Sequence, residues 1–232
     1  MTDASTPVGR RVFLGLVGAG VLGVLFGSRV QDFLAVHAPK TGPVAQVLPI
    51  GEHFRYYTVT DDFPSRAPGA YTLEVKGLVD RPFTLTYEEL RAMTPTMFTK
   101  DFQCVTGWRV PGVRWTGVML ADLLDRARPQ TTARALRFTS FDGEYTESLT
   151  LDQARRDDVI VAYDLDGKPL GRDHGGPARL YVAPMYGYKS CKWLSGIEVV
   201  DRVIPGYWED EGYDVDGWVG RSNGRDDAPT ST

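Results

Sequence analysis

The sequence predicts an α+β fold in which mixed, mostly antiparallel β-structure carries short helices. Segments with alternating apolar and polar residues outnumber segments with helical periodicity. The chain also holds 25 glycines and 15 prolines, which is typical of many turns. No series of strand–helix–strand units and no glycine-rich dinucleotide loop is found in the sequence, so a doubly wound parallel sheet is not expected.

The predicted strands follow one another in chain order. Residues 70–79 (AYTLEVKGLV) alternate apolar and polar positions before a turn. Residues 135–151 alternate on both sides of Asp142-Gly143, and this dipeptide predicts a hairpin. Three apolar segments predict further strands, the first of them followed by an Asp-Gly turn: 159–170, 178–184 and 193–201.

Three segments show helix signals. Residues 85–90 have Thr86 as N-cap and Glu89 at the capping-box position, which predicts a short helix. Residues 116–127 place apolar side chains at helical spacing and predict about three turns that begin near Thr116. Residues 151–159 predict another short helix.

The N-terminal residues 1–38 have the features of a targeting segment. Arg10 and Arg11 stand directly before an apolar run over residues 12–27, and this order resembles a twin-arginine export signal. The run is longer than most signal cores and shorter than most membrane spans, so a cleaved signal and an uncleaved anchor both stay open. Either alternative predicts that the folded part lies outside the cytoplasm.

The remaining chain divides into three parts. Residues 39–50 are rich in proline and predict a linker, residues 51–220 predict one domain, and residues 221–232 predict a disordered polar tail. The formal net charge is −4 and no long basic block occurs, so the sequence does not predict nucleic-acid binding.

Counting metal ligands narrows the chemistry. The chain has two cysteines and three histidines, and no two of them stand at metal-ligand spacing. This argues against a zinc site or an iron–sulfur cluster, which need three or four such ligands. The sequence has no CxxCH motif for covalent haem and no GxSxG motif of a hydrolase. A cysteine nucleophile paired with a histidine stays open.

One metal chemistry is compatible with so few ligands. Molybdenum held by a pterin dithiolene takes sulfur from its cofactor, and the protein then needs to supply a single thiolate, such as Cys104. The cofactor carries a phosphate, which requires cationic side chains. Residues 173–194 gather four candidates: His174, Arg179, Lys189 and Lys192.

Several blocks of the sequence carry a resemblance. The segments 101–108 (DFQCVTGW), 114–124, 174–194 (HGGPARLYVAPMYGYKSCKWL) and 206–213 (GYWEDEGY) resemble, in order, blocks of the sulfite oxidase family of molybdopterin-dependent oxidoreductases. The similarity is greatest to the bacterial exported branch, to which a periplasmic methionine-sulfoxide reductase belongs. The resemblance implies a molybdopterin-binding domain of the sulfite oxidase type.

The resemblance also implies roles for individual residues. Cys104 takes the position of the molybdenum ligand and is the predicted catalytic residue. The other predicted cofactor contacts are His53, Tyr56, Tyr57, Ser140, His174, Arg179, Lys189, Ser190, Cys191 and Lys192. Family members that oxidise sulfite use an arginine upstream of the cysteine, and the basic residues upstream in this chain are Lys100 and Arg91. Arg109 is a candidate for the substrate funnel.

The function that the resemblance implies is transfer of an oxygen atom to or from a small substrate, such as a sulfoxide, an N-oxide or a sulfite-like compound. It implies molybdenum-molybdopterin without a nucleotide, no haem in this chain, and a monomer. An external carrier would then exchange the electrons, either a membrane b-type cytochrome or a cytochrome c. Two alternatives stay open: an exported binding module without cofactor that is stapled by a Cys104–Cys191 disulfide, and the cysteine-nucleophile enzyme.

Overall fold

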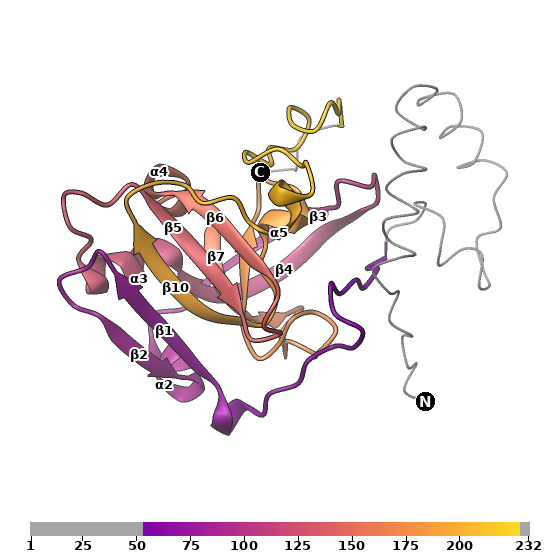
Figure 1. Cartoon of the computed structure of the whole chain (residues 1–232). Coiled ribbons are helices and arrows are strands. Elements are labelled where there is room, and N and C mark those ends of the chain that lie inside the picture. Colours follow the sequence, from indigo (N-terminus) through magenta and orange to yellow (C-terminus); the bar gives the residue numbers. More distant parts are fainter. Residues whose placement is uncertain (1–52, 228–232) are drawn as a thin grey trace, which may run out of the picture.

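The computed structural model describes residues 53–227. The predicted signal or anchor, the predicted linker and residues 228–232 of the predicted tail lie outside this range. Figure 1 shows two β-sheets with short helices at their ends, which confirms the predicted α+β class with mostly antiparallel pairing. Within residues 53–227, no helix combines the length and the apolar character that crossing a membrane requires.

The first sheet has the strand order β2-β1-β10-β5-β6. Strand β1 runs parallel to β10, and the other pairs are antiparallel. The hairpin predicted at Asp142-Gly143 is confirmed because it joins β5 to β6. The strands are β1 (Thr72–Gly77), β2 (Phe83–Thr86), β5 (Ala135–Ser140), β6 (Thr146–Thr150) and β10 (Leu194–Val200).

The second sheet has the order β3-β4-β7-β8, with β9 also paired to β7, and all its pairs are antiparallel. Asp166 and Gly167 form the predicted turn between β7 and β8, and both adopt positive φ, at 50° and 77°. The strands are β3 (Thr96–Gln103), β4 (Arg109–Met119), β7 (Val159–Leu165), β8 (Lys168–Pro169) and β9 (Arg179–Val182).

The first predicted helix is confirmed by its cap. Helix α2 (Tyr87–Ala92) begins after Thr86, whose Oγ1 accepts a hydrogen bond from the Glu89 N–H at 3.2 Å. The Glu89 carboxylate accepts one from the Thr86 N–H at 2.8 Å, which completes the predicted capping box. Helix α4 (Leu151–Ala154) has the same device, and 3-10 turns cover Pro68–Ala70 and Gly187–Lys189.

The helix predicted over residues 116–127 begins later than the sequence predicts. Helix α3 spans Leu120–Ala127, whereas residues 116–119 extend strand β4. These four residues pair with β7, for example Gly117 with Ala162 and Met119 with Ile160. The prediction of a start at Thr116 was wrong because apolar residues at 118 and 120 fit helical spacing, while strand pairing, which is not local, decides the conformation.

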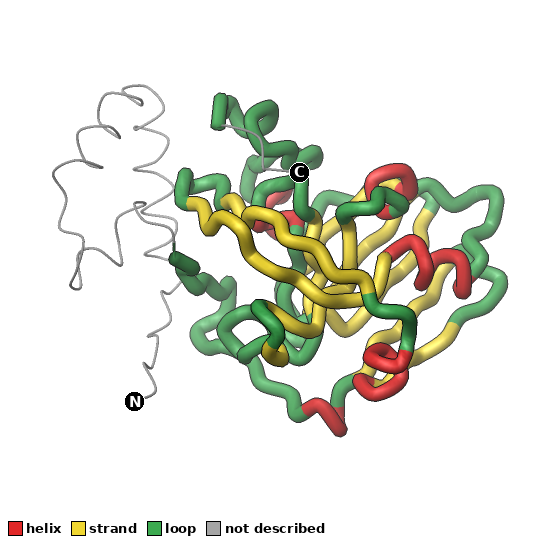
Figure 2. Tube along the Cα trace, turned by 180° about the vertical axis from the view of Figure 1, so that it is seen from behind, coloured by secondary structure: helices red, strands yellow, loops and turns green. Residues whose placement is uncertain are grey.

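Strand β7 is buried on both faces and separates two parts of the core. Val159 and Val161 face the larger cluster, which fills the space between the sheets and also holds side chains of α2 and α3. Ile160 and Ala162 face a second cluster. The second cluster is rich in aromatic side chains and reaches the end of β3, where Cys104 lies (Figure 2 shows the sheets from behind). The fold thereby fixes the site in rigid, packed surroundings.

Candidate active site

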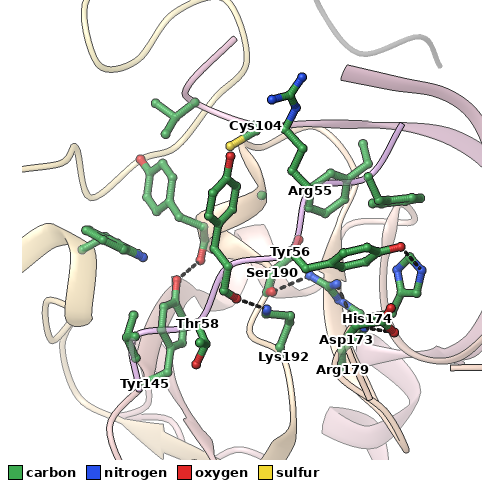
Figure 3. Close-up of a pocket in the computed structure, with 18 of the residues that line it drawn as sticks. Arg55, Tyr56, Thr58, Cys104, Tyr145, Asp173, His174, Arg179, Ser190 and Lys192 are labelled. Atoms are coloured by element: carbon green, nitrogen blue, oxygen red, sulfur yellow. Dashed lines mark hydrogen bonds between the residues drawn. The ribbon is translucent and has the colours of Figure 1, made fainter. Parts of the chain in front are cut away.

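A pocket of about 840 Å³, including its open mouth, lies beside the end of β3 (Figure 3). Five parts of the chain line it. They are the segment before β1, the end of β3 with the turn after it, the hairpin between β5 and β6, the stretch from β9 to β10 together with the loop before it, and the segment around α5 (Tyr207–Asp210). Seven predicted site residues line this pocket: Tyr56, Tyr57, Cys104, His174, Arg179, Ser190 and Lys192.

Cys104 lies in a tight turn directly after β3. Its N–H donates to the Trp108 carbonyl at 2.9 Å, and its own carbonyl accepts from the Gly107 N–H at 3.0 Å. The Thr106 hydroxyl donates to the Cys104 Sγ at 3.2 Å. Burial raises the pKa of the Cys104 thiol, against the hydrogen bonds from Thr106 and the nearby charges of Arg225 and Arg55. A raised pKa disfavours the free thiolate that a cysteine nucleophile needs.

The two cysteines are both free thiols, so the predicted alternative of a Cys104–Cys191 staple is wrong. Cys191 is fully buried in the larger core cluster and does not line the pocket. Its carbonyl accepts a hydrogen bond from the Leu180 N–H at 2.8 Å. This contact fixes the backbone between its two neighbours, Ser190 and Lys192, which do line the pocket.

Arg179 carries a buried positive charge in the pocket, and Figure 3 shows it on the other side of the pocket from Cys104. Only 3% of the residue is exposed. Its guanidinium donates to the carbonyls of His174 at 2.9 Å, Ser190 at 2.8 Å and Leu180 at 3.2 Å. Burial lowers the pKa of Arg179 to about 10, which leaves it charged at neutral pH. Carbonyl oxygens hold this guanidinium in place without neutralising it.

Lys192 adds a second cation to the same end. Its Nζ donates to the Tyr57 carbonyl and lies 4.2 Å from the centre of the Trp193 ring. Burial, assisted by the charge of Arg179, lowers the pKa of Lys192 to about 7. Among residues 53–227, neither Lys192 nor Arg179 forms an ion pair with a carboxylate. Two cations without a counter-charge favour the binding of an anion here.

His174 is a neutral member of this group. Its Nε2 lies 3.1 Å from the hydroxyl of Tyr56, and the rings of Phe54 and Tyr56 meet it edge to face. Burial lowers the pKa of His174 to about 4, and the charges of Arg179 and Lys192 act in the same direction. The imidazole is therefore uncharged at neutral pH and offers a hydrogen bond to a ligand in the pocket.

Four other predicted contacts do not line the pocket. His53 is exposed, and the Ser140 hydroxyl accepts from the Asp142 N–H at 3.1 Å within the hairpin. Lys189 is fully buried between Glu147 and Glu209, and Cys191 lies in the core as described above. The roles of these residues as cofactor contacts stay predictions.

Arg55 is a pocket residue that the sequence reasoning missed. It is buried, with 8% of its surface exposed, and lies beside Cys104 in Figure 3. Arg91 and Arg109, which the sequence offered as candidates, instead pair with Asp164 and Asp101. The signal that could have found Arg55 is its position directly before Tyr56 and Tyr57, which were both predicted to contact the cofactor.

Aromatic side chains form most of the remaining walls. The residues that sequence reasoning did not assign to the site are Phe54, Thr58, Val59, Phe102, Val105, Trp108, Asp142, Tyr145, Asp173, Gly187, Tyr188, Trp193, Trp208 and Tyr213. The sequence shows these aromatic residues clearly, but aromatic residues of an ordinary core look the same. Only the tertiary structure separates the two groups.

Comparisons with known proteins identify the family. Residues 60–208 match the family model described as "Oxidoreductase molybdopterin binding domain". The chain is 35% identical over 147 residues to "Uncharacterized oxidoreductase YuiH" of Bacillus subtilis, covering 63% of this chain and 74% of that protein. The chain belongs to this family of molybdopterin-binding oxidoreductases, and it is an enzyme of the sulfite oxidase family, as predicted.

Two further relatives match most of this chain. "Protein-methionine-sulfoxide reductase catalytic subunit MsrP" of Ralstonia nicotianae is 30% identical over 190 residues, covering 73% of this chain and 56% of that protein. "Sulfite oxidase" of Arabidopsis thaliana is 29% identical over 200 residues, covering 72% and 47%. This chain therefore spans about half the length of these two relatives.

A solved structure shows the same fold. The sulfane dehydrogenase SoxCD from Paracoccus pantotrophus aligns with a TM-score of 0.57 and 23% sequence identity, covering 63% of this chain and 42% of that one. The predicted sulfite-oxidase-type fold is thereby confirmed.

Proposed function

We propose that this protein uses a molybdenum–molybdopterin cofactor, without a nucleotide, to transfer an oxygen atom to or from a small substrate. The substrate classes that fit are sulfoxides, N-oxides and sulfite-like compounds. The single observation that carries the proposal is the pairing of two features in one pocket. A lone buried thiol lies at one end, and two cations without a counter-charge lie at the other.

The residues of the pocket fit this cofactor. Cys104 would supply one soft sulfur ligand, which is what a metal already held by a dithiolene requires. Arg179 and Lys192 would bind the phosphate, with neutral His174 and Ser190 as further hydrogen-bonding groups. When bound, the cofactor supplies two-electron redox chemistry coupled to oxygen-atom transfer.

Residues of this chain would place a charge and a hydrogen-bond donor near Cys104, where the substrate would bind. Arg55 places a positive charge beside Cys104, where it can hold an oxygen of the substrate. Burial raises the pKa of Tyr57 to about 12, so its hydroxyl keeps its proton and can donate a hydrogen bond in the pocket. Trp108 and Trp208 on the walls exclude water from the reacting groups.

The proposal places the protein outside the cytoplasm, exported by the twin-arginine pathway, with residues 12–27 as a cleaved signal or a membrane anchor. The order of residues in 9–27 supports this location. An external cytochrome, either a membrane b-type cytochrome or a cytochrome c, exchanges single electrons with a monomeric chain. The name of the relative MsrP as a catalytic subunit supports a separate partner.

Elemental analysis tests the proposal. Protein purified from a molybdate-supplied host should hold about one molybdenum per chain. Turnover is then screened with sulfoxides, N-oxides and sulfite, using artificial electron carriers. Absence of molybdenum together with a reactive thiol of low pKa would support the cysteine nucleophile instead. Absence of both would support a binding module.

A further inference from the structure

The turn between β3 and β4 holds Cys104 in a fixed position. Gly107 within this turn adopts a positive φ of 104°, a conformation that favours glycine. The side-chain amide of Gln103 donates to the Cys104 carbonyl at 3.3 Å. On the other side, Val105 is buried in an apolar cluster with aromatic side chains. Because the backbone is held on both sides of Cys104, the side chains of the turn have defined positions relative to its sulfur.

Thr106 directs its hydroxyl at this sulfur. The hydroxyl donates a hydrogen bond to the Cys104 Sγ at 3.2 Å. Threonine hydroxyls in turns often bond to nearby backbone groups instead. A threonine side chain is stiff because it is branched at Cβ, so holding the hydroxyl in one orientation costs little conformational entropy. The turn therefore presents a preorganised hydrogen-bond donor to the sulfur.

Thr106 reaches the sulfur without being part of the pocket wall. Cys104, Val105 and Trp108 of the same turn line the pocket, whereas Thr106 does not. Only 9% of Cys104 is exposed, so water has little access to the sulfur and cannot readily replace the hydroxyl. Thr106 is therefore placed to act on a bound cofactor through Cys104 and not by direct contact.

A hydrogen bond to a cysteine sulfur that binds a metal changes the electronic properties of that metal. The donor draws electron density toward itself, so the sulfur donates less to the metal. Weaker donation stabilises the lower oxidation state, which raises the reduction potential. The potentials of iron–sulfur and blue-copper sites depend on hydrogen bonds at the cysteine sulfur.

We propose that Thr106 is a positioning residue for the predicted molybdenum ligand. Its hydroxyl orients the Cys104 sulfur and raises the reduction potential of the metal bound to it. The inference rests on the proposed function, since it concerns the protein ligand of that cofactor. The hydroxyl thereby sets how readily the site takes up electrons from a substrate or from an external carrier.

Two variants separate the hydroxyl from the shape of the side chain. Thr106→Val removes the hydroxyl and keeps a branched side chain of similar size. Thr106→Ser keeps the hydroxyl and removes the methyl group. Both leave in place the backbone N–H of Thr106, which also contributes a hydrogen bond to Cys104. The two variants are therefore matched controls for each other.

The reduction potential of molybdenum-loaded protein is the direct readout. A redox titration followed by electron paramagnetic resonance of the molybdenum measures it in wild type and in both variants. In Thr106→Val we expect the ratio of oxidised to reduced metal at a fixed solution potential to rise about three- to tenfold. For a one-electron couple this corresponds to a fall of about 30–60 mV in the reduction potential. Thr106→Ser should keep the wild-type potential.

Molybdenum content after dialysis is the second readout. Loss of molybdenum from Thr106→Val, with a normal content in Thr106→Ser, would support the orienting role of the hydroxyl. An unchanged or raised potential in loaded Thr106→Val would overturn the inference. Equal changes in both variants, in potential or in molybdenum content, would overturn it as well. The proposed function would stand in these cases, because the wild-type protein holds molybdenum, whereas a wild-type protein without molybdenum would overturn both.

Discussion

Two lysines three positions apart show the difference between a structural charge and a binding charge. Lys189 is completely buried, and its ammonium contacts the carboxylates of Glu147 and Glu209. Lys192 contacts the Tyr57 carbonyl and the Trp193 ring. A buried cation that has carboxylate partners is already neutralised by the fold. A buried cation without carboxylate partners keeps an uncompensated charge until an anion binds to it.

The buried ion-pair group of Lys189, Glu147 and Glu209 links three parts of the fold, which explains its burial. Glu147 lies on β6, Lys189 in the 3-10 turn after β9, and Glu209 in α5. The second oxygen of Glu209 also accepts from the Gly206 N–H at 2.7 Å. The group thereby joins the hairpin, the pocket loop and α5, which carries Trp208 into the pocket. We therefore expect substitution of Lys189 to lower the stability of the fold and substitution of Lys192 to lower the affinity for the cofactor.

The largest expected effect concerns the thiol. Cys104→Ser should lower turnover by at least about a hundredfold, because it removes a direct metal ligand. Substitution of residues that only orient a metal ligand already lowers activity by up to about a hundredfold. The fold should persist, since the rest of the pocket is unchanged. Cys191→Ala is the matched control, because it removes the thiol that lies in the core. Full redox turnover in Cys104→Ser would contradict the assignment of Cys104.

The next effect tests the structural charge. Lys189→Met leaves the buried acidic side chains of Glu147 and Glu209 without their cation and should reduce the free energy of unfolding by about 3–5 kcal/mol. Urea denaturation followed by tryptophan fluorescence measures it. Burial raises the pKa of Glu147 well above its ordinary value, which favours a protonated carboxyl. Glu147→Gln, which resembles that form, should therefore cost less than about 1.5 kcal/mol.

Stability near wild type in Lys189→Met would show that the fold does not depend on this charge. A Glu147→Gln variant as unstable as Lys189→Met would show that the carboxylate, and not its protonated form, is present.

The binding charge predicts the opposite pattern. Lys192→Met should leave the free energy of unfolding of the cofactor-free protein unchanged or raised, since a partly buried cation without a counter-charge is removed. Its affinity for molybdopterin should fall about tenfold, the loss of one charge-assisted hydrogen bond. Molybdenum content after dialysis and denaturation of the cofactor-free protein report the two effects separately. Normal cofactor content in Lys192→Met would contradict the proposal that Lys192 binds the phosphate.

The last prediction is a dependence of stability on pH. In the cofactor-free fold, the pKa of Lys192 falls from 10.5 to about 7 through burial and the charge of Arg179. Between these values the unfolded chain binds more protons than the folded chain, so stability rises as pH increases from about 7 to about 10. Calorimetry between pH 7 and pH 9 should show a smaller rise in Tm for Lys192→Met than for wild type. Parallel curves for the two proteins would contradict the lowered pKa.

The fold could be predicted largely from local signals. Alternation along residues 70–79 and the capping box at Thr86 depend only on neighbours in sequence, and both are confirmed. The start of α3 was wrong because residues 116–119 respond to pairing with β7, more than forty positions away. Long-range pairing is what a local pattern cannot show.

The site residues also divide into those that the sequence predicts and those that depend on long-range contacts. Cys104 lies in the same pocket as His174, Arg179 and Lys192, although it comes from a segment far from theirs in the sequence. The sequence could not separate Lys189 from Lys192, because the partners of Lys189 stand 42 and 20 positions away. It also missed Arg55, whose position beside Cys104 exists only in the folded chain.

The central claim is that the sulfur of Cys104 binds molybdenum in the loaded protein. Molybdenum K-edge X-ray absorption measures the sulfur ligands directly. The account predicts that Cys104→Ser, loaded with cofactor, shows one sulfur ligand fewer than the wild-type protein, while Cys191→Ala shows the same number. An identical sulfur count in wild type and Cys104→Ser would contradict it.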